Sequence, residues 1–173
     1  MKNKQFSRRT RLPKRVLFVC LGNICRSPAA EGILRHIVEV NGMQHAVVVD
    51  SAGLGSWHVG ELPDIRMRRH GERHGYHFDS RARVFESSDF DKFDFVVAMD
   101  DNNIDELKGK ARSPYDFKKI VPIARYLRHF PMYNSVPDPY YGGDNGFELV
   151  IQMLEDACQT LYESLVADVN PNT

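Results

Sequence analysis

The stretch VCLGNICRSP, from Val19 to Pro28, joins the end of an apolar run to the start of a helix-forming segment. The apolar run RVLFVC (15–20), which overlaps the start of this stretch, is rich in branched and aromatic residues, as is typical of a buried strand. The segment SPAAEGILRHIVEV (27–40) opens with a capping serine, Ser27, and a proline, and apolar residues then recur at helical spacing. The sequence therefore predicts a strand, a tight loop and a helix in direct succession.

The rest of the chain alternates in the same way between short apolar runs and amphipathic segments. Further strands are expected at 45–52, 93–100 and 117–123, and further helices at 63–75, 101–108 and 147–166. This alternation predicts an α/β fold, a single domain in which a central, twisted, parallel sheet of about four strands carries helices on both faces. In such folds the loops at the carboxyl ends of the strands bind ligands, so the loop after the first strand is the expected ligand-binding loop.

Length and composition agree with one folded domain. The chain has 173 residues, of which 42% are hydrophobic and 27% charged. No apolar run approaches the roughly 18 residues that a membrane span requires. The N-terminus lacks a secretory-type apolar segment and three cysteines cannot all pair within one chain, which favours the reducing cytoplasm.

Charge is distributed unevenly along the chain. The first 15 residues hold 7 of the 23 basic residues and no acidic one, so the remainder, with 16 basic and 23 acidic residues, carries a charge of −7. We expect residues 1–14 to form a disordered basic tail, 15–168 the folded domain, and 169–173 a short C-terminal tail. Without a structured basic module no nucleic-acid partner is expected, and a weak electrostatic tether through the tail is left open.

The loop itself carries the residue types of an anion site. Gly22 and Asn23 permit a tight turn in which backbone N–H groups converge near a helix N-terminus. Arg26 adds a planar guanidinium that grips two phosphoryl oxygens, and the same positive field favours the thiolate form of Cys20. Without these neighbours, a cysteine at the end of an apolar strand would be interpreted as a core residue.

A metal site is not expected. Cys20 and Cys25 lack a second pair of Cys or His ligands at useful spacing. His70, His74 and His77 are expected at a solvated helix end, and no other cofactor is implied.

Four motifs together resemble the low-molecular-weight protein tyrosine phosphatases over the range 15–166. VLFVCLGNICRSP (16–28) is similar to the phosphate loop of that family, and DSAGLGSWHVGELPD (50–64) to its substrate-wall loop. VVAMDDNN (96–103) resembles its third-strand motif and DPYYGG (138–143) its acid loop. The resemblance implies hydrolysis of phosphotyrosine in protein substrates, and of small aryl phosphates, without a metal.

The resemblance also implies roles for individual residues. Cys20 becomes the nucleophile that forms a cysteinyl phosphate, Arg26 the phosphate ligand, and Asp138 the general acid and then the base. Trp57 and Tyr140 become the walls of a deep slot that admits phosphotyrosine and not the shorter phosphoserine, with Leu21 and Ile24 at its rim.

A supporting network is implied around the loop. Its members fall on Asn23, Ser27, Ser51 and Ser80, and Ser27 is expected to donate to the Cys20 sulfur. Ser80 stands where many family members carry histidine, which makes the rigidity of the loop an open point. Cys25 is implied to form a reversible disulfide with Cys20, while a small buried residue filling the loop remains the alternative.

Two other functions compete with the phosphatase. A thiol-dependent arsenate reductase of the same fold needs further redox cysteines, and none lies between Cys25 and Cys158, which is expected in the core of the last helix. A catalytically silent phosphate-binding module would be expected to lack Cys20, Arg26 or Asp138, and all three are present. The phosphatase is therefore the favoured function.

Overall fold

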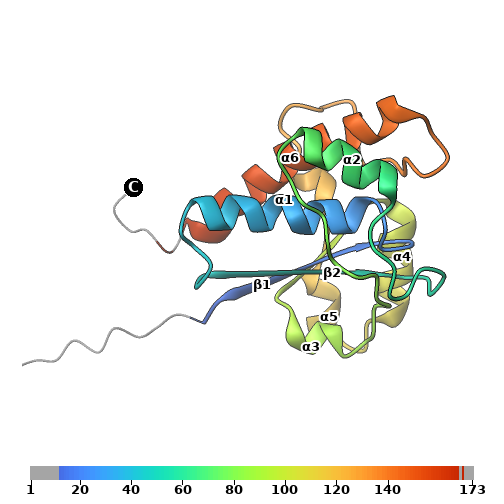
Figure 1. Cartoon of the computed structure of the whole chain (residues 1–173). Coiled ribbons are helices and arrows are strands. Elements are labelled where there is room, and N and C mark those ends of the chain that lie inside the picture. Colours follow the sequence, from blue (N-terminus) through green and yellow to red (C-terminus); the bar gives the residue numbers. More distant parts are fainter. Residues whose placement is uncertain (1–11, 168, 170–173) are drawn as a thin grey trace, which may run out of the picture.

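The computed structural model describes residues 12–167 and 169. Strands and helices alternate along most of the described chain, and its longest helix comes last (Figure 1). The elements are β1 (Lys14–Cys20), α1 (Arg26–Val40), β2 (Val47–Gly53), α2 (Ile65–Arg73), α3 (Asp89–Lys92), β3 (Phe95–Ala98), α4 (Asp101–Lys110), α5 (Pro114–Lys119), β4 (Ile120–Pro122), the 3-10 turn η1 (Ile123–Tyr126) and α6 (Asp144–Val166).

The four strands form one parallel sheet in the order β2-β1-β3-β4. In the centre, Val16 of β1 lies opposite Val49 of β2 on one side and Phe95 of β3 on the other. Because β1 has neighbours on both edges and layers on both faces, every residue from Val16 to Cys20 is buried. The predicted single-domain α/β fold is confirmed.

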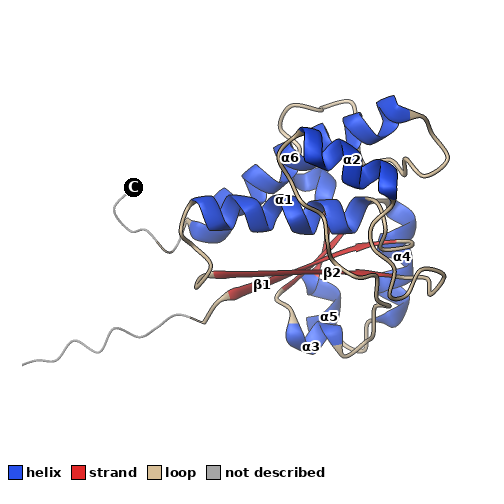
Figure 2. Ribbon diagram, viewed as in Figure 1, coloured by secondary structure: helices blue, strands red, loops and turns tan. Residues whose placement is uncertain are grey.

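Helices cover both faces of the sheet (Figure 2). Val16 and Phe18 face the layer made by α1 and α6, with α2 packed on α6. Leu17 and Val19 face the other layer, where α3, α4 and α5 lie. This alternation follows from the two-residue period of a strand, and it explains why β1 reads as a continuous apolar run.

The segment 117–123 was predicted wrongly in part. Only Ile120–Pro122 is extended, whereas Phe117 lies in α5. The reason is a helix start that the apolar pattern concealed: the Ser113 side chain accepts a hydrogen bond from the Asp116 N–H, and Pro114 occupies the first helical position.

The predicted terminal tails lie largely outside the described residues. At the N-terminal end, Lys14 is already part of β1, pairs with Val47 and donates its N–H to the Ala46 carbonyl. At the C-terminal end, α6 runs to Val166. No helix in the described ranges is both long and apolar enough to cross a membrane.

Candidate active site

The loop between β1 and α1 is held in a tight turn against the end of β2. Asn23 has a φ of 56°, in the left-handed region that asparagine tolerates. Gly53 lets the two segments meet, because a Cβ there would lie 3.0 Å from both the backbone nitrogen of Asn23 and the carbonyl carbon of Gly22. Leu54 and Gly55 then donate their N–H groups to the carbonyls of residues 20 and 21. The loop backbone is therefore fixed by backbone contacts.

The thiol of Cys20 lies where β1 ends and this loop begins. Cys20 is buried, and its Sγ lies 3.0 Å from Ser27 Oγ. Helix α1 begins at Arg26, one residue earlier than predicted, and Cys25 occupies the N-cap position without a side-chain cap. The predicted capping role of Ser27 is therefore wrong. Its hydroxyl faces the thiol because Ser27 lies within the first turn of the helix.

Arg26 is buried and faces two carboxylates. Its Nη1 lies 2.6 Å from Asp100 Oδ2 and 3.0 Å from the Val136 carbonyl oxygen, and its Nη2 lies 3.5 Å from Asp138 Oδ2. Burial by itself lowers the pKa of Arg26, but Cys20, Asp100 and Asp138 outweigh it and raise the pKa above its ordinary value. The guanidinium therefore stays charged beside Cys20.

Asp100 was not predicted as a site residue. It caps α4, since its side chain accepts a hydrogen bond from the Asn103 N–H, and it orients Arg26 with the same carboxylate. The available signal was its position two residues after the end of β3, because residues at the carboxyl ends of parallel strands face the ligand edge of the sheet.

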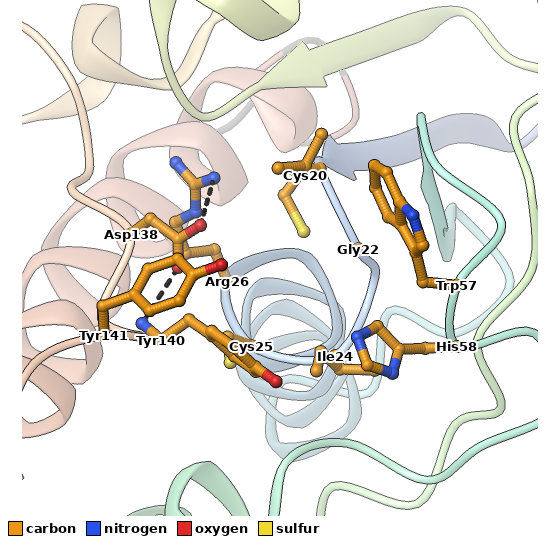
Figure 3. A pocket seen from close by; sticks show the side chains of 11 residues that line it. Cys20, Gly22, Ile24, Cys25, Arg26, Trp57, His58, Asp138, Tyr140 and Tyr141 are labelled. Atoms are coloured by element: carbon orange, nitrogen blue, oxygen red, sulfur yellow. Dashed lines mark hydrogen bonds and ion pairs between the residues drawn. The ribbon is translucent and has the colours of Figure 1, made fainter.

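A cavity of about 300 Å³ opens above the loop. In Figure 3 the Cys20 sulfur points into it, with Trp57 on one side and Tyr140 on the other. The lining residues are Cys20, Leu21, Gly22, Ile24, Cys25, Arg26, Trp57, His58, Asp138, Tyr140 and Tyr141. The predicted wall and acid residues thus meet the loop in one place, although they come from segments up to 120 positions apart. Asn23 and Ser27, also predicted to bind phosphate, do not line the cavity.

Asp138 enters the cavity from a loop that reaches the end of β3. The Val136 N–H donates to the Met99 carbonyl at 2.9 Å, which places the loop beside the strand end. Asp138 Oδ1 accepts from the Tyr140 N–H at 3.0 Å, and its side chain is 37% exposed. The carboxyl is thus oriented and still open to solvent.

A family model described as low molecular weight phosphotyrosine protein phosphatase matches residues 15–171. The chain belongs to this family. A low molecular weight protein-tyrosine-phosphatase of Streptomyces coelicolor is 45% identical over 87% of this chain and 93% of its own length. The crystal structure of an Entamoeba histolytica protein tyrosine phosphatase, 42% identical, covers 91% of this chain and 99% of its own, with a TM-score of 0.86.

The crystal structure of a Drosophila arginine phosphatase has the same fold. It is 36% identical, covers 86% of this chain and 96% of its own, and has a TM-score of 0.79. The family and enzyme class predicted from the sequence are therefore confirmed for this chain, a low molecular weight protein-tyrosine phosphatase.

Trp57, at one side of the phosphatase cavity, lies over a glycine. It is 68% exposed, and a Cβ on Gly55 would lie only 1.8 Å from its Cζ3 atom. The indole therefore reaches its place only because residue 55 has no side chain.

Tyr140, at the other side, is held by Arg66. Arg66 donates to the Tyr140 carbonyl at 3.0 Å, and its guanidinium carbon lies 5.5 Å from the centre of the ring. Arg66 also pairs with Asp64, whose N–H donates to the Ile24 carbonyl at 2.7 Å. The wall and the phosphate loop are thus linked through one arginine.

His58 and Tyr141 line the phosphatase cavity but were not predicted. His58 Nδ1 lies 2.7 Å from Glu61 Oε2, and a Cβ on Gly22 would lie 3.3 Å from the His58 ring. Tyr141 is 93% exposed and its ring packs edge to face on Tyr140 at 4.9 Å. Each is next in sequence to a predicted wall residue, which was the only signal for it.

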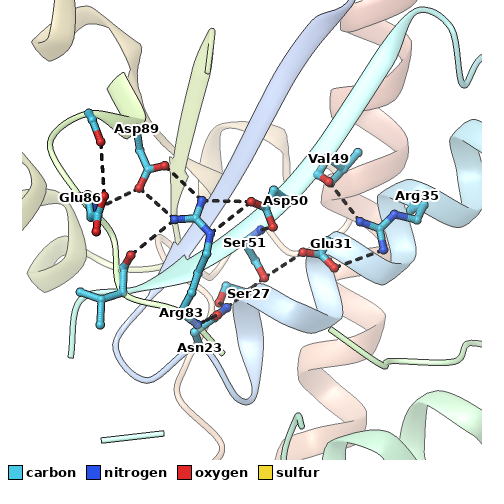
Figure 4. Close-up of polar contacts among 12 residues, drawn as sticks. Asn23, Ser27, Glu31, Arg35, Val49, Asp50, Ser51, Arg83, Glu86 and Asp89 are labelled. Carbon is cyan, nitrogen blue, oxygen red and sulfur yellow. Dashed lines mark hydrogen bonds and ion pairs between the residues drawn. The ribbon is translucent and has the colours of Figure 1, made fainter. Parts of the chain in front are cut away.

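Three of the four residues predicted for the supporting network are connected (Figure 4). Asn23 Nδ2 donates to Ser27 Oγ at 2.8 Å and to Ser51 Oγ at 2.9 Å. Ser80 makes no hydrogen bond to these residues, so its predicted place in the network is wrong. The reason is that the Arg83 N–H, from the same segment, donates to Asn23 Oδ1 at 3.0 Å and occupies that position.

Cys25 is buried beside the phosphatase cavity. Burial, and then the charge of Asp64, raise the pKa of the Cys25 thiol far above its ordinary value. Cys20, Cys25 and Cys158 are all free thiols. Cys25 is therefore a neutral thiol at neutral pH, next to the proposed nucleophile.

The histidines of α2 and its C-terminal turn were predicted to be solvated, but not all of them are. His70 is 4% exposed and its ring stacks on Phe147 of α6 at 5.9 Å. His74 Nε2 lies 2.7 Å from Glu148 of α6, while His77 is exposed. The prediction is wrong for His70 because α2 packs on α6, a contact that its own sequence does not show. No group of three or more His, Cys, Asp or Glu residues in the described ranges is arranged to hold a metal ion.

Proposed function

We propose that this phosphatase hydrolyses phosphotyrosine in proteins, and small aryl phosphates, through a phosphocysteine intermediate. One observation carries the proposal: a thiol, a buried guanidinium and an oriented carboxyl, from Cys20, Arg26 and Asp138, line one cavity with aromatic sides. A phosphate on the loop would meet the Arg26 fork and the N-terminus of α1, which are suited to a dianion.

In the first step the Cys20 thiolate attacks phosphorus in line with the leaving oxygen. The S–P bond forms as the P–O bond breaks, and the protonated Asp138 carboxyl gives its proton to the departing phenolate. Arg26 and the loop N–H groups stabilise the charge on the equatorial oxygens. A well-placed acid of this kind contributes a factor of roughly 10² to 10⁴.

In the second step water attacks the phosphorus of the intermediate. Asp138, now a carboxylate, takes a proton from the water, the O–P bond forms, and the P–S bond breaks with its electron pair returning to Cys20. The hydroxyl of Ser27, 3.0 Å from the sulfur, stabilises that developing thiolate by donating a hydrogen bond. Phosphate then leaves and the free thiolate is restored.

The aromatic walls support phosphotyrosine as the substrate. Trp57 and Tyr140 flank a cavity of about 300 Å³ with Cys20 at its base, which suits a phenyl ring that carries its phosphate down to the sulfur. The shorter phosphoserine would leave its phosphate above Cys20. Because a relative of similar fold is named an arginine phosphatase, phosphoarginine is the substrate class to compare.

The alternatives fit the chain less well. An arsenate reductase would relay a disulfide to further cysteines, but Cys158 is fully buried in α6. A silent phosphate-binding module would have no need of an oriented acid beside Arg26, as Asp138 is.

The test is turnover of p-nitrophenyl phosphate, a phosphotyrosine peptide and a phosphoarginine peptide, in EDTA. Wild-type turnover should resist the chelator, vanish with Cys20→Ser and fall by about a hundredfold with Asp138→Ala. Asp105→Ala, at an exposed carboxyl of α4, is the matched control and should retain activity. Absence of turnover by the reduced wild-type protein would refute the proposal, and preference for the phosphoarginine peptide would refute the substrate class.

We further propose that Cys20 and Cys25 form a protective disulfide. An oxidant such as hydrogen peroxide converts Cys20 to the sulfenic acid, which condenses with the Cys25 thiol to give the disulfide and water. Peroxide treatment followed by mass spectrometry should reveal the Cys20–Cys25 peptide, and dithiothreitol should restore activity. If no such peptide forms, Cys25 is only a small buried residue of the loop.

The cytoplasm is the proposed location, because a catalytic thiol with two further free cysteines requires reducing surroundings. The basic tail is proposed to give a weak, salt-sensitive attraction to anionic surfaces. Deleting residues 2–12, which leaves β1 intact, should abolish retention on an anionic resin while kcat stays unchanged. Unchanged retention would dismiss the tether.

A further inference from the structure

A chain of hydrogen bonds runs from Arg83 to the nucleophile through two side chains of the phosphate loop. The Arg83 N–H donates to Asn23 Oδ1 at 3.0 Å, and Asn23 Nδ2 donates to Ser27 Oγ at 2.8 Å (Figure 4). Ser27 Oγ in turn lies 3.0 Å from Cys20 Sγ. Asn23 and Ser27 are buried, so solvent does not compete for these groups.

The direction of each of these hydrogen bonds follows from the Arg83 N–H. A backbone N–H can only donate, so the Asn23 oxygen must face Arg83 and the NH₂ group must face Ser27. The Ser27 oxygen accepts there, which leaves its single hydrogen for the Cys20 sulfur. A flipped Asn23 amide would set two N–H groups against each other and would let Ser27 turn its hydrogen away from the sulfur.

The side chain of Arg83 holds its own backbone in place. Its guanidinium lies between Asp50 of β2, with Nη2 3.0 Å from Asp50 Oδ2, and Asp89 of α3, with Nη1 3.0 Å from Asp89 Oδ2. Its carbonyl accepts from the Gly53 N–H at 2.8 Å. Asp89 is buried, and these carboxylates outweigh the effect of burial and raise the pKa of Arg83 above its ordinary value.

We propose that Arg83 is a positioning residue for the second chemical step. By fixing the Asn23 amide it makes Ser27 a donor to the Cys20 sulfur at the moment when the P–S bond breaks and the electron pair returns to that sulfur. The inference rests on the phosphocysteine mechanism proposed above. Arg83 itself does not line the cavity.

The proposal predicts a particular split between kinetic constants. The ratio kcat/KM reports formation of the phosphocysteine, whereas kcat reports its hydrolysis when that second step limits turnover, which a burst of p-nitrophenol reveals. Arg83→Lys keeps the charge but cannot bridge two carboxylates in the same planar way. With p-nitrophenyl phosphate we expect kcat to fall about tenfold, KM to fall in parallel, and kcat/KM to stay within about twofold, with a burst of p-nitrophenol in rapid mixing.

A matched control lies elsewhere in the chain. Arg112 also bridges two carboxylates, those of Asp91 and Asp116, between α3 and α5 and away from the cavity. Arg112→Lys should lower stability without changing the split between kcat and KM. Ser27→Ala should show the same split as Arg83→Lys, and the double variant should show no further loss, because both act through one hydrogen bond.

Three results would overturn the proposal: wild-type kinetics for folded Arg83→Lys, a loss confined to kcat/KM, or additive losses with Ser27→Ala. If Arg83→Lys does not fold, Asp50→Asn, which weakens one of the two ion pairs at a partly exposed site, must show the split or the proposal is wrong. A wild-type protein that forms no phosphocysteine would instead refute the proposed function.

Discussion

Glu31 is a buried carboxyl whose ionisation should make the fold less stable as the pH rises. It lies on α1 with its side chain 3% exposed. Ser51 Oγ donates to its Oε1 at 3.1 Å, Arg35 Nη1 lies 3.3 Å from its Oε2, and Asp50 adds a nearby like charge. Burial is the largest effect and, against the opposing pull of Arg35, raises the pKa of Glu31 from 4.5 to about 7.

The sign and size of the effect on stability follow from that pKa. Between pH 4.5 and 7 the folded state binds more protons at Glu31 than the unfolded state, so the free energy of unfolding falls as the pH rises through this window. A difference from 4.5 to about 7 corresponds to about 3 kcal/mol, most of it lost between pH 5 and 8. Glu31→Gln mimics the protonated acid and removes this loss.

The assay is urea denaturation of both proteins at pH 5 and pH 8. Glu31→Gln should be close to the wild type at pH 5 and more stable by about 1–3 kcal/mol at pH 8, because charges common to both proteins cancel in the comparison. Glu39→Gln, at an exposed position of the same helix, is the control and should change neither value. A difference between wild type and Glu31→Gln that is the same at both pH values would refute the reasoning.

Two further predictions concern the cavity. Asp100→Asn keeps a side chain able to cap α4 but removes the charge that lies 2.6 Å from Arg26. The kcat/KM for p-nitrophenyl phosphate should therefore fall about tenfold. An unchanged value would show that Arg26 needs no such partner. Gly55→Ala should displace Trp57, which would raise KM for aryl phosphates and shift the fluorescence of this single tryptophan. Gly109→Ala is the control: its Cβ would meet nothing within 4 Å, so it should change neither KM nor fluorescence.

The fold was predictable where periodicity and burial agree. The buried run at 15–20, with the helix pattern directly behind it, led to β1, the phosphate loop and α1 almost at their observed bounds. The strand predicted at 117–123 is only partly correct, because residues 117–119 lie on a short helix that Ser113 and Pro114 begin. Apolar content over a few residues does not separate a strand from a helical turn, whereas capping chemistry does.

The site was predictable where the chemistry requires one particular residue type. A thiol, an arginine and an aspartate in their motifs led to Cys20, Arg26 and Asp138, which the fold brings to one cavity. Asp100 and Arg83 were missed, because each contacts Arg26 or Asn23 of the loop across a distance in sequence that only folding closes. Ser80 was misplaced for the same reason: which member of a loop donates to Asn23 depends on backbone direction, which sequence does not record.

The sequence by itself determined the order of elements, the phosphate loop and the chemical groups at hand, because local periodicity, turn propensity and side-chain chemistry act over a few neighbouring residues. The tertiary structure alone decided which carboxylates meet Arg26, which backbone N–H orients Asn23, and which histidine is buried. Those outcomes depend on contacts between segments far apart in the chain, where distance and direction are set by how the sheet and its helices pack.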